Sequence, residues 1–372
     1  MIVSAALGMS LILAVGLVYC NLVLDYLFGL VSHDMGIDLG TANTLVLIKG
    51  KGIVIREPSV VARHKKTKKV IAIGGEAKKM LGREPATLTV VRPLRDGVIS
   101  DFDATAAMLS FYIKEVHRTP GIIPKIPKPK VVIGIPSGVT EVERRAVVGA
   151  ATSAGARKAY LIEEPMAAAI GIGLPIDEST GSIVVDIGGG TTEIAVVSLG
   201  GVVVNKSIRT AGDEMDEAII SYLRLKYGVL IGQPTAEEVK IAIGSAHSGR
   251  NEEVLYSVIR GRDLETGLPR SVKVSAGEIR EALSPVMKEI IEAIKDLIEE
   301  TPPELVSDLL NRGIAVAGGG ALLRNVDIAI SEATKMPVWI ADEPLTAVVR
   351  GTGKVLLDSK LLERVKVTGG LK

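Results

Sequence analysis

Two short stretches of the sequence place an aspartate between an apolar strand and a turn rich in glycine or threonine. The first is IDLGTANT, residues 37 to 44, and the second is VDIGGGTTE, residues 185 to 193. Glycine in a hairpin turn lets backbone N–H groups approach an anion without obstruction by a Cβ atom, and threonine hydroxyls add further donors. Both turns are therefore candidates for binding phosphate.

The aspartates of these stretches, Asp38 and Asp186, cannot contact phosphate directly because both groups are anionic. They suit a hydrated Mg²⁺ that bridges carboxylate and phosphate oxygens. The repetition suggests a duplication into two similar lobes, each with one glycine-rich hairpin. A third glycine turn, GIAVAGGGA, follows a strand at residues 313 to 321. Two such hairpins facing each other would clamp a nucleoside triphosphate between the lobes.

Other signatures for nucleotide binding or hydrolysis do not occur. The GTGK at residues 351 to 354 lacks the upstream glycine of a P-loop, and no GxGxxG is present. The serine of GIPSG, residues 134 to 138, stands one place too late for a hydrolase nucleophile elbow.

The composition predicts a globular α/β chain with more than one core. It has 372 residues, of which 47% are hydrophobic and 23% charged. A net charge of +1 argues against a nucleic-acid binder steered by positive charge. Cys20 is the only cysteine, and the four histidines lack HExxH or CxxC neighbours, so neither a disulfide within the chain nor a zinc centre is expected.

Two segments suggest membrane contact. Residues 1 to 24 carry no charged side chain, and a span needs about 20 such residues. A secretory signal is disfavoured because the basic n-region and an A-x-A-like cleavage site are missing. A membrane anchor is therefore predicted, with an upstream start codon as the alternative.

The second segment is TPGIIPKIPKPK, residues 119 to 130, with four prolines. Its apolar tip contains Ile122 and Ile123, and three lysines follow, a pattern that suits an anionic membrane surface. A proline-stiffened connector is the alternative interpretation.

With these residues in place, the chain resembles the actin-like ATPases, the superfamily of actin, the sugar kinases and the heat-shock chaperones. Within it the sequence is similar to the MreB family of bacterial cell-shape filament proteins over about residues 34 to 360. The segments that carry the resemblance, in family order, include GIDLGTANTLV, EPSVVA, RPLRDGVISDF, VERRA, LIEEPMAAAIG, VVDIGGGTTEIAV, GDEMDEAI, TGLPR, TPPELVSD, GGGALL and DEPLTAV.

The resemblance implies a duplicated actin-like, ribonuclease H-like α/β fold of two lobes, with nucleotide in the interlobe cleft and an apolar N-terminal helix. The expected limits are a membrane segment at 1–33, a first lobe at 34–172 with 345–372, and a second lobe at 173–344. Small subdomains are expected at about 62–94 and 209–274.

Residue roles carried over by position complete the expected site. Phosphate contacts are implied at Thr41, Ala42, Asn43, Gly188, Gly189 and Gly190. The nucleoside is expected beside Glu237, Glu238, Val239 and Lys240, and the closing turn comprises Gly318, Gly319, Gly320 and Ala321. Asp38 and Asp186 match the positions that hold hydrated Mg²⁺.

The resemblance also assigns a residue to the attacking water. Glu143 in VERRA matches the position that orients or activates it, with Thr191 nearby. From the residues alone, Glu143 is a first-turn acid that stabilises its helix dipole. Both interpretations stay open at this point.

The implied function is slow, Mg²⁺-dependent ATP hydrolysis coupled to polymerisation into antiparallel double filaments. These filaments are expected in the cytoplasm, on the inner face of the cytoplasmic membrane, where they organise the cell-wall elongation machinery and determine cell shape. The alternatives are a small-molecule kinase of the same superfamily, for which the chain has little spare length, and a scaffold that binds ATP without hydrolysing it. A peptide-binding chaperone would need a separate substrate domain.

Overall fold

The computed structural model describes residues 32–118, 126–249 and 255–367 of the chain. The apolar N-terminal segment, Ile122 and Ile123 lie outside these residues, so the two membrane predictions are not addressed. Within the described ranges, no helix has both the length and the apolar character needed to cross a bilayer.

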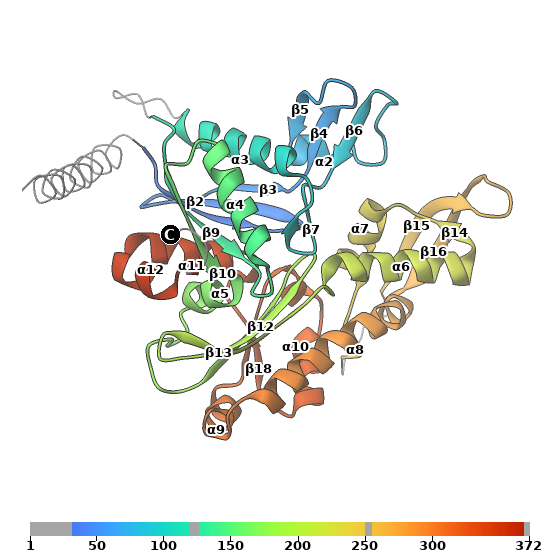
Figure 1. Cartoon of the computed structure of the whole chain (residues 1–372). Coiled ribbons are helices and arrows are strands. Elements are labelled where there is room, and N and C mark those ends of the chain that lie inside the picture. The colour runs from blue at the N-terminus through green and yellow to red at the C-terminus, as the bar shows by residue number, and fades with distance from the viewer. Residues whose placement is uncertain (1–31, 119–125, 250–254, 368–372) are drawn as a thin grey trace, which may run out of the picture.

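Two five-stranded sheets with the same topology form the centres of two lobes (Figure 1). The first has the order β10-β9-β1-β2-β3, with strands β1 (Met35–Leu39), β2 (Asn43–Ile48), β3 (Gly52–Pro58), β9 (Lys130–Ile135) and β10 (Lys158–Glu163). The second has the order β13-β12-β11-β17-β18, with β11 (Ser182–Ile187), β12 (Thr192–Ser198), β13 (Gly201–Ile208), β17 (Ile314–Ala317) and β18 (Val338–Ile340).

Strand pairing repeats between the sheets. β1 pairs antiparallel with β2 and parallel with β9, while β11 pairs antiparallel with β12 and parallel with β17. In each case the hairpin is local, whereas the parallel partner comes from much later in the chain. This is the arrangement that a duplicated lobe requires, so the predicted two-lobed α/β fold is confirmed.

A small three-stranded sheet extends from each lobe on the same side of the molecule (Figure 1). The first contains β4 (Val61–His64), β5 (Val70–Ile73) and β6 (Leu88–Val91), with the short helix α2 (Gly75–Lys78). The second contains β14 (Val229–Leu230), β15 (Tyr256–Asp263) and β16 (Pro269–Ser275), beside α6 (Gly212–Tyr227) and α7 (Gln233–Ile243). A two-stranded ribbon, β7 (Leu94–Arg95) and β8 (Val98–Ile99), follows the first small sheet.

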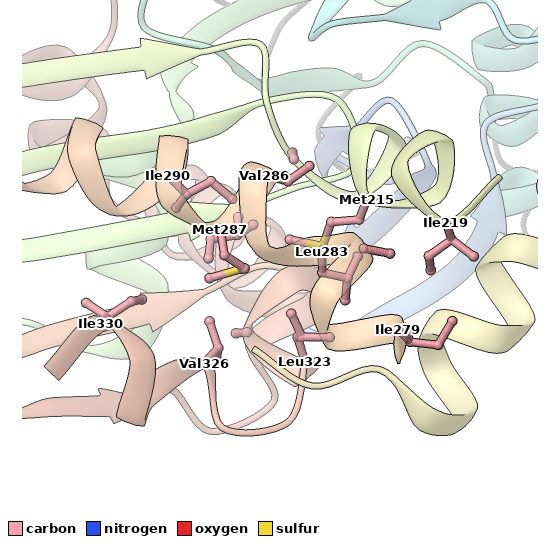
Figure 2. Close-up of a cluster of buried hydrophobic side chains, with 14 of the residues drawn as sticks. Met215, Ile219, Ile279, Leu283, Val286, Met287, Ile290, Leu323, Val326 and Ile330 are labelled. Atoms are coloured by element: carbon pink, nitrogen blue, oxygen red, sulfur yellow. The ribbon is translucent and has the colours of Figure 1, made fainter. Parts of the chain in front are cut away.

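The outer face of each large sheet is covered by helices. On the first lobe these are α3 (Phe102–His117) and α4 (Glu141–Ser153), and on the second α8 (Ala276–Glu300), α9 (Pro303–Arg312) and α10 (Val326–Thr334). Figure 2 shows how the apolar stripe of α8 packs: Leu283 and Met287 lie between residues of α6, such as Met215, and Val326 of α10. Burial of this stripe stabilises the second lobe.

Two inner helices, α5 (Glu164–Ile172) and α11 (Ala347–Leu357), lie between the two large sheets (Figure 1). They share one buried cluster with Val132 of the first sheet and Val184 of the second. The last described helix is α12 (Ser359–Val365). Beyond it, the backbone N–H of Val367 donates to Leu161 O of β10 at 2.9 Å. The last helices thus return to the first lobe, as expected, while the exact domain limits stay a prediction.

Helices α5 and α11 approach each other at two glycines. A Cβ atom on Gly171 would lie 1.8 Å from Ala347 O, and one on Gly351 would lie 1.8 Å from Ala167 O. Both distances are far below van der Waals contact, and both obstacles are backbone atoms. The spacing of the two helices, and through them of the two sheets, therefore depends on these glycines.

Gly351→Ala is expected to lower the free energy of unfolding by about 2–3 kcal/mol, because the added methyl group forces α5 and α11 apart. Gly277→Ala in α8 is the matched control: its Cβ would meet no atom closer than 3.8 Å. There we expect a gain of up to about 1 kcal/mol from reduced entropy of the unfolded chain. Urea unfolding measures both, and equal stabilities of the two variants would contradict the prediction.

Candidate nucleotide site

The turns of the two central hairpins touch each other across the gap between the lobes. A Cβ atom on Gly189 would lie 2.6 Å from Ala42 Cβ, and one on Gly190 would lie 2.9 Å from Thr41 Oγ1. Only glycine allows the second turn to approach the first so closely. The two sequence motifs therefore face each other, as a phosphate clamp requires.

A cavity of about 390 Å³ opens beside this contact. Of the residues predicted from the sequence, its wall includes Asp38, Thr41, Ala42, Asn43, Asp186, Gly188, Gly189, Gly190, Thr191, Glu237, Lys240, Gly318, Gly319 and Gly320. The cavity wall does not include Glu143, Glu238, Val239 or Ala321. Glu238 is exposed, whereas Val239 and Ala321 are buried in the core of the second lobe.

Three carboxyl groups, those of Asp38, Glu164 and Asp186, line one part of the cleft, and a fourth, that of Glu193, is buried behind them. Asp38 is the last residue but one of β1, Glu164 begins α5, and Asp186 and Glu193 are register partners on β11 and β12. Burial raises the pKa of Asp38 to about 7. Burial, followed by the charges of Asp38 and Glu193, raises the pKa of Asp186 to about 8. Burial and the neighbouring acids, Glu193 foremost, also raise the pKa of Glu164 well above its usual value.

These carboxyl groups fit a hydrated divalent cation. Within the described residues, no three Asp, Glu, His or Cys side chains are close enough to ligate a metal directly. A cation that keeps its water shell needs no such set, because carboxylates can bind it through water. Asp186 is only 6% exposed, and since burial and the neighbouring acids raise its pKa to about 8, a nearby cation would favour its anionic form. Asp38 and Asp186 would hold Mg²⁺ in this way.

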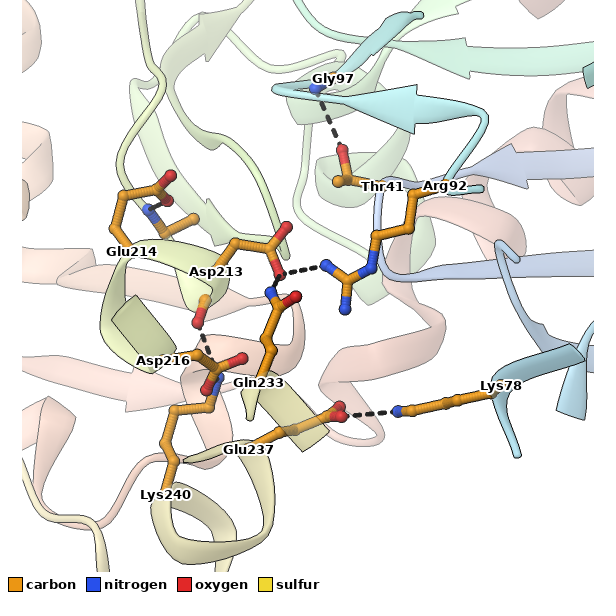
Figure 3. A network of polar contacts seen from close by, with 12 residues as sticks. Thr41, Lys78, Arg92, Gly97, Asp213, Glu214, Asp216, Gln233, Glu237 and Lys240 are labelled. Carbon is orange, nitrogen blue, oxygen red and sulfur yellow. Dashed lines mark hydrogen bonds and ion pairs between the residues drawn. The ribbon is translucent and has the colours of Figure 1, made fainter. Parts of the chain in front are cut away.

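The opposite end of the cavity carries a lysine between two oxygen groups (Figure 3). Lys240 Nζ donates to Gly212 O at 2.8 Å and lies 2.8 Å from Asp216 Oδ1. Burial raises the pKa of Asp216 to about 6, although the charge of Lys240 opposes this shift. Asp216 and Gly212 lie in GDEMDEAI, a segment to which the sequence analysis assigned no site residue.

Two ion pairs link the lobes at the cleft (Figure 3). Lys78 Nζ lies 2.6 Å from Glu237 Oε2, and Arg92 Nη1 lies 2.9 Å from Asp213 Oδ1. Lys78 and Arg92 belong to the first lobe, and their partners to the second. Sequence reasoning missed both cations and Asp213, because their pairing depends on how the lobes are placed.

Glu143 has the contacts of a helix cap. Its Oε2 accepts hydrogen bonds from Thr140 N at 2.6 Å and from Thr140 Oγ1 at 2.8 Å, and Glu143 N donates to Thr140 Oγ1 at 3.3 Å. The Thr140 backbone N–H, followed by its hydroxyl, holds the pKa of Glu143 below its usual value. These contacts agree with the helix-end interpretation. The catalytic role of Glu143 remains a prediction that this geometry does not support.

Glu164 lines the cavity instead, and sequence reasoning did not single it out. It is the first residue of α5, directly after β10. A Cβ atom on Gly134 of β9 would lie 3.4 Å from Glu164 Cγ, and Gly134 is the register partner of Asp38. The nearer obstacle to such an atom is Val348 Cγ1 at 2.9 Å, so Gly134 allows α11 and the start of α5 to pack closely over β9 beside Asp38. The EEP sequence at the end of a strand was the available signal.

The fold and site together define the class of two-lobed actin-like proteins. The sequence matches the family described as MreB/Mbl protein over residues 32–364, and the chain belongs to this family. Cell shape-determining protein MreB of Escherichia coli K12 is 52% identical over 332 residues, which cover 88% of this chain and 94% of that protein.

Solved structures agree with this assignment. MreB5 of Spiroplasma citri bound to ADP superposes with a TM-score of 0.83 at 38% identity, covering 90% of this chain and 98% of that one. The same protein bound to AMPPNP gives a TM-score of 0.82. A MamK double helical filament gives 0.73 at 23% identity, covering 87% of this chain and 98% of that chain, a likeness of fold alone.

Asp186→Asn is expected to stabilise the nucleotide-free protein increasingly as the pH rises. The folded chain keeps the proton of Asp186 up to about pH 8, whereas the unfolded chain loses it near 3.8, the ordinary pKa of an aspartate. The free energy of unfolding of the wild type therefore falls as the pH rises between these two values. The asparagine variant has no group that titrates at this position, so it does not lose this stability. The variant should gain roughly 2–4 kcal/mol over the wild type between pH 5 and pH 8. Denaturant titrations measure the difference, and a gain independent of pH would contradict the assignment.

Proposed function

We propose that this chain binds ATP with Mg²⁺ in the interlobe cleft, hydrolyses it slowly and polymerises into membrane-associated filaments that determine cell shape. The observation that carries the proposal is the direct contact of two glycine-rich hairpins in front of a buried acid cluster. Support for the nucleotide comes from the Spiroplasma citri relative, which was solved with ADP and with AMPPNP. Support for the cellular role comes from the cell shape-determining relatives.

The hairpins supply the phosphate contacts. Backbone N–H groups at Gly189 and Gly190 and the Thr41 hydroxyl are candidate donors at the touching turns, whereas the Gly188 N–H already donates to Thr191 O at 2.9 Å. Bound Mg²⁺ would supply positive charge that offsets the phosphates and the acids Asp38 and Asp186. Lys240 and Glu237, on one face of α7, would lie beside the nucleoside.

We assign the orientation of the attacking water to Glu164, with Thr191 beside it. Both side chains line the cavity, and the Glu164 carboxyl group lies in the acid cluster. A carboxyl group with a raised pKa is a stronger base once it is ionised, and a cation in the cluster would favour that ionisation. Glu143 is the rival for this role, from the family resemblance.

Glu164→Gln is expected to slow phosphate release by about 10²–10⁴-fold, because the amide cannot accept the proton of water. Glu143→Gln is the paired variant, and we expect hydrolysis to stay within about threefold, since only a helix cap is weakened. The assay measures phosphate from Mg-ATP without any added acceptor, next to AMPPNP affinity by calorimetry.

The reverse pattern, with Glu143→Gln inactive and Glu164→Gln active, would restore the role predicted from the resemblance. If the wild type itself releases no phosphate but binds AMPPNP, the protein is a scaffold that binds ATP without hydrolysis. Phosphate transfer that requires an added small molecule would instead identify a kinase.

Membrane association is proposed from the sequence, through Ile122 and Ile123 or through residues 1 to 24. The double change Ile122→Ser and Ile123→Ser is expected to reduce the fraction that sediments with anionic vesicles by about threefold or more, because two apolar side chains that would enter the membrane surface are lost. Ile71→Ser is the control, since Ile71 is an isoleucine 49% exposed on β5. Binding that is lost only when the chain starts at residue 25 would assign the contact to the N-terminal segment alone.

A further inference from the structure

Glu193 is a buried acid that contacts neither nucleotide nor water in the proposed hydrolysis. It lies on β12, is 1% exposed and does not line the cavity. Its Oε2 accepts a hydrogen bond from Ser137 N at 3.0 Å, and its Oε1 accepts one from Ser207 Oγ at 2.6 Å. Ser137 belongs to the turn between β9 and α4 of the first lobe, while Ser207 lies on β13 of the second. The carboxylate therefore joins the lobes.

The turn that Glu193 holds reaches the phosphate end of the cleft through its neighbour, Pro136. A Cβ atom on Gly97 would lie 2.5 Å from Pro136 Cγ and 3.0 Å from Thr191 Cγ2. Gly97 is thus packed between the first-lobe turn and the second phosphate hairpin. Its backbone N–H also donates to Thr41 Oγ1 at 3.0 Å, as Figure 3 shows.

These contacts form a closed ring. Glu193 accepts the hydrogen bond from Ser137, and the preceding residue, Pro136, packs against Gly97. Gly97 packs in turn against Thr191, which precedes Glu193 by two residues in the chain. Gly138 belongs to the same interface, since a Cβ atom there would lie 3.4 Å from Ser207 Cβ. A ring that crosses the lobe boundary twice fixes the first-lobe turn relative to the hairpin.

We propose that Glu193 is a positioning residue for the hydrolytic end of the cleft: its carboxylate locks the Pro136–Ser137 turn onto β12 and β13 and so holds Gly97 and Thr191 in place. This inference rests on the proposed ATPase activity. Glu193 touches neither nucleotide nor water in this role. It acts through the ring, so its loss misplaces Thr191 while the nucleotide still binds.

Three variants separate this role from simple packing. Glu193→Gln keeps an acceptor oxygen for Ser137 N and turns its amide toward Ser207, whose hydroxyl then accepts. Glu193→Ala removes both hydrogen bonds. Ser207→Ala removes only the bond within the second lobe and leaves the link between the lobes.

The experiment measures kcat and KM for phosphate release from Mg-ATP, AMPPNP affinity, and hydrogen exchange of a peptide covering residues 133 to 139, in which the Ser137 N–H is an internal amide. For Glu193→Ala we expect kcat to fall by about tenfold or more, with AMPPNP affinity within about threefold and faster exchange at Ser137. For Glu193→Gln and Ser207→Ala we expect kcat within about threefold and exchange close to that of the wild type.

Other results would overturn the inference. Unchanged kcat and unchanged exchange in Glu193→Ala would show that the ring does not position the site. An equal loss of kcat and AMPPNP affinity would show general damage to the fold. If kcat of Glu193→Gln is as low as kcat of Glu193→Ala, the negative charge of Glu193 is required and its hydrogen bonds alone do not position the site. A wild type without phosphate release would refute the proposed ATPase instead, while the exchange at Ser137 would still test the link.

Discussion

The structure depends on the contact between the β1–β2 and β11–β12 turns. This contact brings the ends of two sheets together, and with them the acids that end the strands. Asp38 and Asp186 consequently lie together in the cleft, and burial raises the pKa of Asp38 to about 7 and that of Asp186 to about 8. Such an arrangement destabilises the empty fold at neutral pH. A cation with phosphate bound between the turns, as proposed, would remove that penalty and so couple ligand binding to folding stability at this point.

The helices between the sheets make the contact possible. α5 and α11 cross where Gly171 and Gly351 bring backbone against backbone, which sets a short distance between the two lobes. The ion pairs Lys78–Glu237 and Arg92–Asp213 then link the lobes at the cleft. These side chains are partly exposed, so each pair contributes little to stability. They are better suited to setting the opening of the cleft than to holding the lobes together.

The repeat of DxG turns predicted the two lobes, the facing hairpins and most of the cavity wall, because these features are local and occur twice. Placement of acids from other loops could not be predicted in the same way. Glu143 and Glu164 both begin helices after strands of one sheet, and sequence alone does not say which one reaches the cleft. The difference lies in the placement of the helices: Glu164 begins α5, which lies between the two large sheets, whereas Glu143 lies in the first turn of α4 on the outer face of the first sheet. The two ion pairs between the lobes likewise depend on the relative orientation of the lobes, which no sequence motif specifies.

Asp186 and Glu193 lie directly opposite each other on β11 and β12. This pair connects the cleft, which Asp186 lines, to the lobe boundary, where Glu193 binds Ser137. Residues directly opposite in an antiparallel pair lie on the same face, where like charges repel. Each acid therefore needs its own compensation: Glu193 has two hydrogen-bond donors, one from each lobe, whereas Asp186 has only the ion expected with the nucleotide. A cation bound at Asp186, as proposed, would offset the negative charge that Asp186 gains when it ionises opposite Glu193. The proposed cation site and the interlobe link would thus be coupled through this one register pair.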